Sequence, residues 1–496
     1  MKKHILFFSA VALFLSSCGI FSPLSENTGS ISIKMPEGSE RSNDVSEITS
    51  FSVELYNSDN IPIVQIESAP GKSLTFESLE PGSYAIFIKA FKPTSKEFAA
   101  CGEKSGIIVK AGATTYETIT LKWVITDWTT LSAKLNNVKD DVGNVYVSGD
   151  FEIASTISFS GTANIISTGN GVTFSRQKGY ASNFFSLYSA SLTFKGSESA
   201  RIVFDGTSET ETQPSNLITN GGTTTFEYCS FKNNSSSTFA SVYLLDNYDS
   251  SNTTFRFCSF TGNKGPKGGT VYVGTGDKVC FENCRFENNT SENNTSSSGG
   301  GAVYIADSAT GTFSDCRFEN NTSSSDGGAV YIAKSATGTF SDCIFGNAEN
   351  ETLGNYCTGA TGGGGAVYAT GASITLSNCE FYYNKATGDC GNGGAIGADS
   401  SSTVTITVGC TFKNNATALL ESSSTHGGAL YINNSSLVLP NSGNIFENNI
   451  EGNKTESILS DIYIVSSEQL GTVNGTVYDT GSYTVAKDGA LTSTSQ

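Results

Sequence analysis

The chain has few of the residues on which catalytic and metal sites most often depend. Its 496 residues include only two histidines. One of them, His4, lies in the first few residues, so His426 stands alone in the rest of the chain. This scarcity excludes a histidine-centred catalytic triad and a histidine-rich metal site. Proline is also rare, with nine residues, whereas glycine is abundant, with 53. Leu, Lys and Arg, which favour helices, are scarce as well, and a composition of this kind favours strands and turns.

Basic residues and long apolar runs are also in short supply. The 29 Lys and Arg residues stand against 47 Asp and Glu residues, which gives a formal net charge of −18 and a pI of about 4.6. A chain this acidic argues against nucleic acid as a partner. Beyond the first residues, no stretch is long and apolar enough to span a bilayer as a helix.

The first 17 residues have the features of a bacterial export signal. Lys2 and Lys3 are followed by an apolar run over residues 5–15, which is too short for a spanning helix. The sequence Leu-Ser-Ser-Cys that ends at Cys18 resembles the lipobox of bacterial lipoproteins. That resemblance implies a lipid-modified Cys18 as the first mature residue. Since Gly19 follows it rather than Asp, the resemblance also implies anchoring to the outer membrane. The alternative is an ordinary signal peptide with an incidental cysteine.

The region after this segment reads as a short tether and then a small β domain. Residues 18–28 are polar, and residues 29–125 contain alternating apolar runs separated by turn signals, as in Ile31, Ile33 and Met35. We therefore predict a β-sandwich stalk over residues 29–125. Residues 126–137 form the one convincing helix, with Trp128, Leu131 and other apolar residues on a single face.

A repeated unit organises the rest of the chain. The sequence GGAVYIA-x-SATGTFSDC-x-F occurs twice within residues 299–345, and degenerate copies extend over residues 240–446. A single unit of this size cannot bury its own apolar face, so copies must stack on one another. We predict an all-β fold: a right-handed parallel β-helix, pectate-lyase-like, over residues 126–496. The helix at residues 126–137 should then cover the exposed apolar end of the first coil.

Two markers recur in register along the repeats. A Gly-Gly pair followed by apolar residues begins at Gly268, Gly300, Gly327, Gly364, Gly393 and Gly427, and Phe-x-x-Asn begins at Phe231, Phe260, Phe286, Phe318, Phe381, Phe412 and Phe446. Phe345 departs from the second marker, because Asn347 is shifted by one residue. The two markers resemble the repeats of the chlamydial polymorphic outer-membrane proteins, over roughly residues 226–449. This resemblance implies a surface protein of the β-helix type, often an adhesin.

A third marker is a cysteine two residues before the phenylalanine in seven coils: Cys229, Cys258, Cys284, Cys316, Cys343, Cys379 and Cys410. Residues i and i+2 of a strand share a face, so we expect a ladder of buried cysteines beside a ladder of phenylalanines, with Phe318 between Phe286 and Phe345. Each cysteine would serve as a small apolar residue and remain a thiol. Metal binding is the alternative, but no CxxC pair or histidine cluster accompanies the ladder, and we expect no metal or cofactor.

The spacing of the markers locates the insertions. The number of residues from a Gly-Gly pair to the next phenylalanine is nearly constant. The number from that phenylalanine to the following Gly-Gly pair varies widely. All insertions should therefore leave the solenoid at one corner, where loops line up as a surface on which repeat proteins often bind. These loops are residues 290–298, 322–326, 346–363, 385–392 and 416–426. The alternative is that insertions at a turn are merely tolerated.

Three classes of function fit this fold. The sequence favours a lipid-anchored surface protein that acts in binding or display, with a host protein, matrix protein or glycan as the possible ligand. An enzyme acting on polysaccharides is the first alternative, but no catalytic residue is evident. Glu287 and Glu319 repeat with the coil as a solvated outer face, and Asp140 and Asp141 read as part of a turn. An inert surface coat is the other alternative.

Four cysteines and two charged residues complete the expectations. Cys357 and Cys390 belong to neither the cysteine marker nor a strand, and both lie in insertion loops of consecutive coils. Since disulfides form outside the inner membrane, we predict a Cys357–Cys390 bridge. Asp307 and Lys334 are equivalent positions in the two near-identical coils, and we expect both to face outward on adjacent strands. Cys101 and Cys280 have no evident partner.

Overall fold

The computed structural model of the chain divides into two compact units, Met1–Trp123 and Val124–Gln496. The boundary lies two residues before the one expected from the sequence. The structure describes residues 27–35, 48–91, 98–207, 216–236, 240–244, 252–292, 299–359, 363–388, 391–417, 425–440, 442–452, 457–465, 472–474, 476–486 and 490–494. No helix among these residues is long and apolar enough to cross a membrane.

The first unit consists of two small sheets around one apolar cluster. Alternating residues of its strands point into the cluster, including Ile31, Val53 and Ile86, each at most 1% exposed. One sheet has the order β4–β1–β7 and the other β3–β2–β5–β6–β8. The strands are β1 (Gly29–Lys34), β2 (Ser50–Tyr56), β3 (Pro62–Ser68), β4 (Ser73–Leu79), β5 (Gly82–Phe91), β6 (Phe98–Val109), β7 (Thr114–Glu117) and β8 (Lys122–Trp123).

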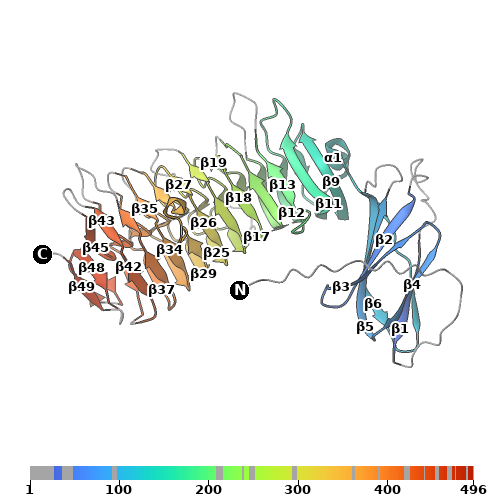
Figure 1. The fold of residues 1–496 in the computed structure, drawn as a ribbon. Helices are drawn as coiled ribbons and strands as arrows, with labels where there is room; N and C mark the ends of the chain where they lie inside the picture. The colour runs from blue at the N-terminus through green and yellow to red at the C-terminus, as the bar shows by residue number, and fades with distance from the viewer. Residues whose placement is uncertain are drawn as a thin grey trace. The chain divides into compact units, whose positions relative to one another are not determined.

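The second unit is a parallel β-helix whose first coil is covered by a short helix, α1 (Trp128–Leu135) (Figure 1). Asp127 caps α1, since its Oδ1 accepts a hydrogen bond from the Thr130 amide at 2.8 Å. Trp128, Leu131 and Leu135 are buried against the first strands, as the sequence predicted. The Trp128 ring packs edge-on against Phe185 at 5.5 Å between centroids.

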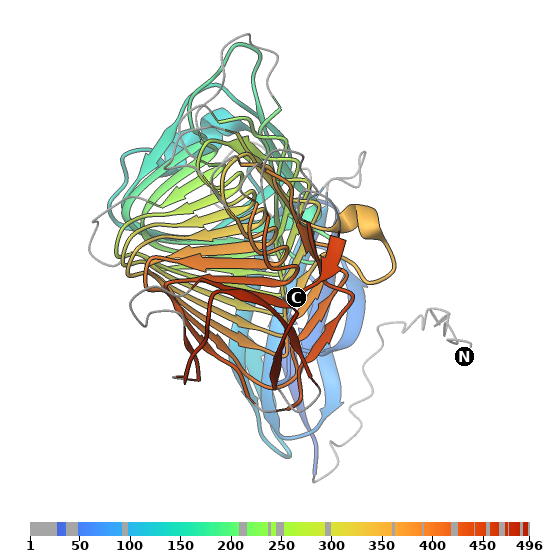
Figure 2. The same cartoon turned by 90° about the vertical axis from the view of Figure 1, so that its left-hand side faces the viewer.

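Each coil contributes strands to stacked rows, which run side by side along the solenoid (Figures 1 and 2). The row that follows Gly-Gly carries the Val-Tyr-Ile sequence. Its strands are β10 (Ile157–Phe159), the start of β12 (Phe185–Lys195), the start of β14 (Ile218–Glu227), β16 (Val242–Leu244), β20 (Val271–Val273), β24 (Val303–Ile305), β28 (Val330–Ile332), β32 (Val367–Thr370), β36 (Ile396–Asp399), β40 (Leu430–Asn433) and β45 (Ile462–Val465).

The second row carries the Thr-Gly-Thr-Phe-Ser sequence. It begins with β9 (Asp141–Ile153) and β11 (Thr162–Arg176), whose long strands also start the third row, and continues through the second halves of β12 and β14. Its remaining strands are β17 (Asn252–Arg256), β21 (Lys278–Glu282), β25 (Thr310–Ser314), β29 (Thr337–Ser341), β33 (Ser373–Ser377), β37 (Thr403–Ile406), β41 (Ser436–Val438) and β46 (Thr472–Val473).

The third row carries the phenylalanine of the Phe-x-x-Asn marker. After β9 and β11 it continues with β13 (Ile202–Asp205), β15 (Cys229–Lys232), β18 (Ser259–Thr261), β22 (Arg285–Glu287), β26 (Arg317–Glu319), β30 (Ile344–Phe345), β34 (Glu380–Tyr382), β38 (Thr411–Lys413) and β42 (Ile445–Glu447).

A separate small sheet forms the remaining side of each coil. All of its strands but the last directly follow an asparagine and are mostly two residues long, and the last pairs antiparallel with the strand before it. They are β19 (Lys264–Gly265), β23 (Thr290–Ser291), β27 (Thr322–Ser323), β31 (Tyr356–Cys357), β35 (Lys385–Ala386), β39 (Ala416–Thr417), β43 (Ile450–Gly452) and β44 (Ser457–Leu459).

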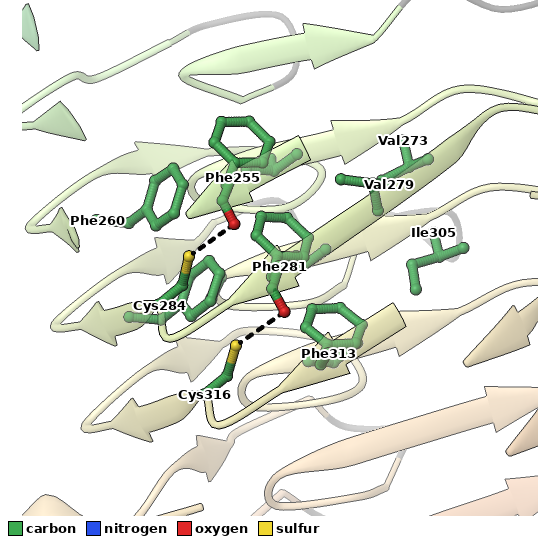
Figure 3. Close-up of a cluster of buried hydrophobic side chains, with 14 of the residues drawn as sticks. Phe255, Phe260, Val273, Val279, Phe281, Cys284, Ile305, Phe313 and Cys316 are labelled. Carbon is green, nitrogen blue, oxygen red and sulfur yellow. Dashed lines mark hydrogen bonds between the residues drawn. The ribbon is translucent and has the colours of Figure 1, made fainter. Parts of the chain in front are cut away.

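Two phenylalanine ladders fill the interior (Figure 3). The expected ladder is confirmed, since the Phe318 ring stacks at 4.6 Å on both Phe286 and Phe345. A second ladder, which the sequence analysis missed, comes from the second row, where Phe313 stacks on Phe281 at 4.9 Å and on Phe340 at 4.6 Å. The two ladders meet edge to face, which is the favoured geometry for aromatic pairs.

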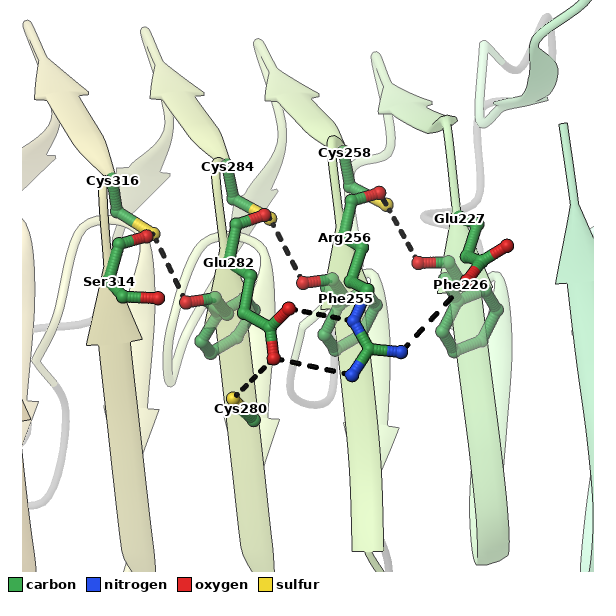
Figure 4. Close-up of polar contacts among 11 residues, drawn as sticks. Phe226, Glu227, Phe255, Arg256, Cys258, Cys280, Glu282, Cys284, Ser314 and Cys316 are labelled. Atoms are coloured by element: carbon green, nitrogen blue, oxygen red, sulfur yellow. Dashed lines mark hydrogen bonds and ion pairs between the residues drawn. The ribbon is translucent and has the colours of Figure 1, made fainter. Parts of the chain in front are cut away.

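The predicted cysteine ladder is buried next to the phenylalanines, and its thiols also form hydrogen bonds. Cys284 Sγ donates to the carbonyl oxygen of Phe255 at 3.4 Å, and Cys316 Sγ donates to that of Phe281 at 3.5 Å (Figures 3 and 4). All ladder cysteines are free thiols. A cysteine here therefore fills a small apolar space and also satisfies a carbonyl group next to a bend.

A ladder of buried asparagines holds neighbouring coils in register. Asn321 Nδ2 donates to Asn355 Oδ1 at 2.9 Å and to the Phe286 carbonyl oxygen at 3.0 Å, while Asn321 Oδ1 accepts from Asn289 Nδ2 at 2.9 Å. The ladder continues over Asn263, Asn289, Asn321, Asn355, Asn384, Asn415 and Asn449, each at most 1% exposed. Asn355, not Asn347, fills the position in the coil of Phe345.

Left-handed residues turn the chain at each corner. In one coil Gly300, Ser308, Asp315 and Asn320 have φ values of 65°, 61°, 52° and 51°. Glycine, asparagine and aspartate tolerate this conformation better than other residues, which explains their abundance in the repeat. The last described coil is closed by antiparallel pairs, in which β45 pairs with β48 (Gly481–Val485), β46 with β47 (Thr476–Val477), and β48 with β49 (Leu491–Ser493).

Candidate functional site

One edge of the solenoid combines a regular backbone with side chains that differ from coil to coil. We define this loop edge as the residues immediately before each Gly-Gly pair: Lys267, Gly299, Asp326, Gly363, Asn392 and His426. Their carbonyl groups form a continuous series of hydrogen bonds with the amides of the preceding coil's glycines. Examples are Gly300 to Asp326 at 2.9 Å and Gly364 to Asn392 at 2.7 Å. The loops that vary in length enter the solenoid at this edge.

The Gly-Gly pairs are required by the packing at this edge. The first glycine has a positive φ, as at Gly327 (61°). The second approaches the next coil so closely that a Cβ on Gly328 would lie 2.0 Å from the Gly365 carbonyl oxygen. No side chain fits there, so the backbone beside the loop edge is fixed. The residue before the pair carries a side chain in four coils, whereas Gly299 and Gly363 are confined by packing, since a Cβ on Gly363 would lie 2.0 Å from the Asn392 carbonyl oxygen.

A ladder of tyrosines lies beside the loop edge, on the outer side of the Val-Tyr-Ile strands. Tyr304 stacks on Tyr272 at 5.3 Å and on Tyr331 at 4.8 Å. These three side chains belong to residues only 5–8% exposed, although they point away from the core. The loop edge covers them: Lys267 Nζ lies 5.7 Å from the Tyr304 ring centre, and Gly299 lies against the ring of Tyr331.

The tyrosine ladder is interrupted at Gly397. Tyr368 leans over this glycine, since a Cβ there would lie 2.7 Å from the Tyr368 ring. Its spacing from Tyr331 widens to 5.9 Å, and its hydroxyl donates to Asp399 Oδ2 at 2.8 Å. Asp399 Oδ1 is buried with no hydrogen-bond partner. The interruption thus brings a carboxylate to the outer side of the ladder.

The environment of the loop edge changes the acidity of Asp326. Its pKa is raised to about 6, chiefly by burial and with a smaller contribution from the charge of Asp399, against the lowering effect of hydrogen bonds from Gly363 and Ser325. Asp326 Oδ1 accepts from the Gly363 amide at 3.1 Å. Burial also raises the pKa of Tyr331 and Tyr368. Asp326 therefore titrates within the physiological range.

The expectation that all insertions leave at one corner is wrong for one coil. Residues 346–354, which include the 3₁₀ helix η2 (Glu351–Leu353), precede the ladder asparagine and leave from the third-row corner, where they project from the side of the solenoid (Figure 2). The reason is that Asn355 takes the ladder position, so the additional residues must loop out before it.

This second insertion also buries Glu319, which the sequence analysis placed on a solvated face. The Glu319 side chain is only 3% exposed and pairs with Arg285 at 2.9 Å and Arg317 at 2.7 Å. Asn347 of the insertion donates to it at 3.0 Å. Burial alone would raise the pKa of Glu319, but its bonds with Asn347, Arg317 and Arg285 outweigh burial and lower it. Glu287 remains half-buried beside Arg285.

The cysteines outside the ladder have three different surroundings. Contrary to expectation, Cys357 lies in a strand, β31, between Ser323 and Ala386 of adjacent coils, because Tyr356 and Cys357 follow the ladder asparagine directly. Its thiol donates to the Ser325 carbonyl oxygen at 2.6 Å. Cys101 is buried in β6 and Cys280 is half-buried on the outer side of β21.

Two predicted site residues, Cys18 and Cys390, lie outside the described residues. The lipidation of Cys18 and the Cys357–Cys390 bridge therefore remain predictions. Residues 293–298, 360–362 and 418–424 of the predicted loops also lie outside the described part of the chain.

The outer surface carries ion pairs that link coils. Arg256 Nε pairs with Glu282 at 2.7 Å and its guanidinium also approaches Glu227 at 3.9 Å (Figure 4). The predicted register of the two coils is confirmed, since Val303 pairs with Val330, and Asp307 and Lys334 are both exposed. Both residues lie in the turn after the Val-Tyr-Ile strand, however, and not on a strand as expected. Asp141 begins β9 and accepts from the Gly143 amide at 2.8 Å, a turn role as predicted.

Within the described ranges, no three His, Cys, Asp or Glu side chains gather closely enough to hold a metal ion. His426 stacks on Tyr463 at 3.8 Å between ring centres. Burial lowers the pKa of His426, opposed by Glu451.

The stacked rows define a parallel β-helix, and comparison with known protein families agrees. A family model described as a right-handed β-helix region matches residues 216–360 and 288–477, which together span 216–477, just over half of the chain. The chain belongs to this right-handed β-helix family. No curated protein matches the sequence. The fold serves both enzymes and non-enzymes, so it does not by itself decide the function.

Sequence reasoning missed the tyrosine ladder and Asp399. The tyrosine ladder had a signal, because a tyrosine follows Gly-Gly-Ala-Val in the repeat and alternation places it outside. Asp399 had none, since it reaches Tyr368 only because Gly397 leaves room for that ring.

The raised pKa of Asp326 predicts a stability effect with a defined sign. A carboxyl whose pKa is higher in the folded state than its usual value of 3.8 destabilises the fold increasingly as pH rises from about 4 to about 6. Asp326→Asn should therefore raise the free energy of unfolding at pH 7–8 by on the order of 1–2 kcal/mol, and change it little below pH 4. Thermal unfolding across pH measures this. Asp307→Asn, at an exposed position, is the control, and an equal effect at both pH extremes would contradict the burial of Asp326.

Proposed function

We propose that this chain is a lipid-anchored cell-surface protein that binds a ligand through the loop edge, in the manner of an adhesin. The observation that carries the proposal is the contrast at this edge. In four coils the residue before the glycine pair is Lys, Asp, Asn or His, and in two it is a glycine confined by packing, while the glycine pairs themselves repeat without change. A scaffold that fixes the backbone and varies the side chains and loop lengths suits ligand binding.

The location rests on the sequence. The export signal and the lipobox-like sequence at Cys18 support anchoring to the outer membrane, and the likeness of the repeats to the chlamydial surface family supports exposure outside the cell. The acidic surface, with a net charge of −18, disfavours nucleic acid as a ligand and suits a solvated extracellular protein.

The anchor is tested by Cys18→Ser. We expect this variant to accumulate as an unprocessed precursor without fatty-acid label, because the lipid is attached to that thiol. Protease treatment of intact cells should cleave the wild-type protein if it faces outward. Normal maturation and membrane fractionation of the variant, or complete protection from protease, would contradict the anchored surface location.

The binding surface is tested by shortening loops. The connection in the coil of β27 is short, with Ser324, Ser325 and Asp326 between the strand and Gly327. Replacing residues 387–392 and 418–426 with Ser-Ser-Asp should leave the stacked core folded, because the glycine positions are kept. We expect such a full-length variant to lose at least tenfold in affinity for extracellular-matrix proteins or arrayed glycans that wild type binds. Equal affinity of the wild type and the shortened variant would show that the loop edge is not the binding site.

Action on a polysaccharide is a second candidate, favoured by one observation. Asp326, with a pKa of about 6, is partly protonated near neutral pH, as a general acid requires. Release of reducing ends from acidic or neutral polysaccharides by wild type, but not by Asp326→Asn, would favour the enzyme over the binding protein.

A further inference from the structure

A second surface, on a different corner from the loop edge, carries two aromatic residues in a strained conformation, one exposed and one partly exposed. This corner separates the second and third strand rows. From coil to coil it is occupied by Tyr228, Phe257, Asn283, Asp315, Asp342, Asn378, Gly409 and Gly443, all with φ between 50° and 92°.

Asparagine, aspartate and glycine suit this left-handed corner, whereas tyrosine and phenylalanine do not. Bulky side chains pay a steric cost at positive φ, yet Tyr228 and Phe257 have φ of 50° and 53°. Neither ring belongs to the apolar core, and Phe257 is 40% exposed. Folding alone is better served by the asparagine found at Asn283. Strain of this kind, at an exposed position, is a reason to look for a function.

The two rings form a stacked platform with a cation at one end. Tyr228 and Phe257 lie 4.7 Å apart between ring centres and within 13° of parallel. The Arg201 guanidinium lies 5.7 Å from the Tyr228 ring centre and donates to the Phe257 carbonyl oxygen at 2.9 Å. Arg201 therefore closes one end of the platform, and the exposed side chain of Asn283 follows at the other end.

Arg201 differs from Arg256, Arg285 and Arg317 on the outer surface, because its charge is not paired with a carboxylate among the described residues. Arg256, Arg285 and Arg317 each pair with glutamate on their own or a neighbouring strand. Arg201 forms no ion pair with a carboxylate in the described part of the chain, although the protein carries a net charge of −18. Since a guanidinium has five N–H donors and one is used here, most of its hydrogen-bonding capacity is left for a ligand.

We propose that Tyr228, Phe257 and Arg201 form a binding site for a glycan that carries an anionic pyranose. The C–H face of a pyranose packs on an exposed aromatic ring, its hydroxyl groups suit the carboxamide of Asn283, and a carboxylate or sulfate pairs with Arg201. A short glycan with a single charge fits better than a polyanion, because the net negative charge of the protein repels many charges at once. The site lies away from the loop edge and does not depend on it.

The strained corner supplies an unusual pair of test variants. Phe257→Asn and Tyr228→Asn install the residue that other coils, such as that of Asn283, carry at this corner, so the corner conformation is retained and its steric cost is relieved. We expect melting temperatures equal to or above that of wild type, together with at least a tenfold loss of glycan affinity. Arg201→Gln should lower affinity for anionic sugars at least tenfold and leave affinity for neutral sugars unchanged. Phe257→Tyr should bind like wild type.

The experiment uses the full mature chain and isothermal titration with four probes: lactose, 3′-sialyllactose, a glucuronate-containing disaccharide and galactose 3-sulfate. Binding of the anionic probes above lactose supports the site, and their order separates carboxylate from sulfate recognition. The loop-shortened variant should bind them normally, which distinguishes this site from the loop edge. The proposal is overturned if wild type binds none of the probes, if Phe257→Asn binds as well as wild type, or if Phe257 proves to serve only contact with a protein.

Discussion

The structure depends on the buried asparagine ladder. From Asn263 to Asn415, each carboxamide donates to the asparagine of the next coil and to a phenylalanine carbonyl of the previous one, as in Asn321 with Asn355 and Phe286. A buried amide without partners would destabilise the fold, so every coil must place its asparagine directly above the last. Once this position is fixed, the phenylalanines beside it stack with 4.6–5.1 Å between ring centres. The cysteines beside it form a ladder of their own.

The same constraint decides where the protein varies. Residues between the glycine pair and the phenylalanine are held by stacking on both sides, so the coil changes little there. Extra residues must leave before the asparagine, as residues 346–354 do, or after the small sheet, at the loop edge. The loop edge is therefore the main place where the solenoid presents different chemistry from coil to coil. The proposed role in binding follows from that division between fixed and variable positions.

Much of the scaffold could be predicted from the sequence, because repetition converts local alternation into long-range contacts. Phe318 stacks between Phe286 and Phe345 since strand periodicity and the repeat leave no other arrangement. The predictions that were wrong concern positions where a coil departs from the repeat. Asn355 and Cys357 could not be placed without knowing that an insertion precedes them, and the same insertion buries Glu319.

The candidate site was less accessible from the sequence, for a related reason. The side chains of the candidate site come from different coils, so they are close in space but far apart in the sequence. Asp399 reaches Tyr368 because Gly397 interrupts the tyrosine ladder, and burial at the loop edge raises the pKa of Asp326. The strain at Phe257 also becomes visible only from its backbone angle, because most other coils carry asparagine, aspartate or glycine at this left-handed position.

Amide hydrogen exchange on Asn321→Ala tests the central claim most directly. The Asn289 amide donates to Asn321 Oδ1 at 3.2 Å, so the account predicts loss of protection at Asn289 and in the coils on either side of Asn321. Asn320→Gly is the matched control, because it removes an exposed carboxamide next door and keeps the left-handed corner. Unchanged protection around Asn289 in Asn321→Ala, or equal loss in the control, would contradict the claim that the asparagine ladder sets the register of the coils.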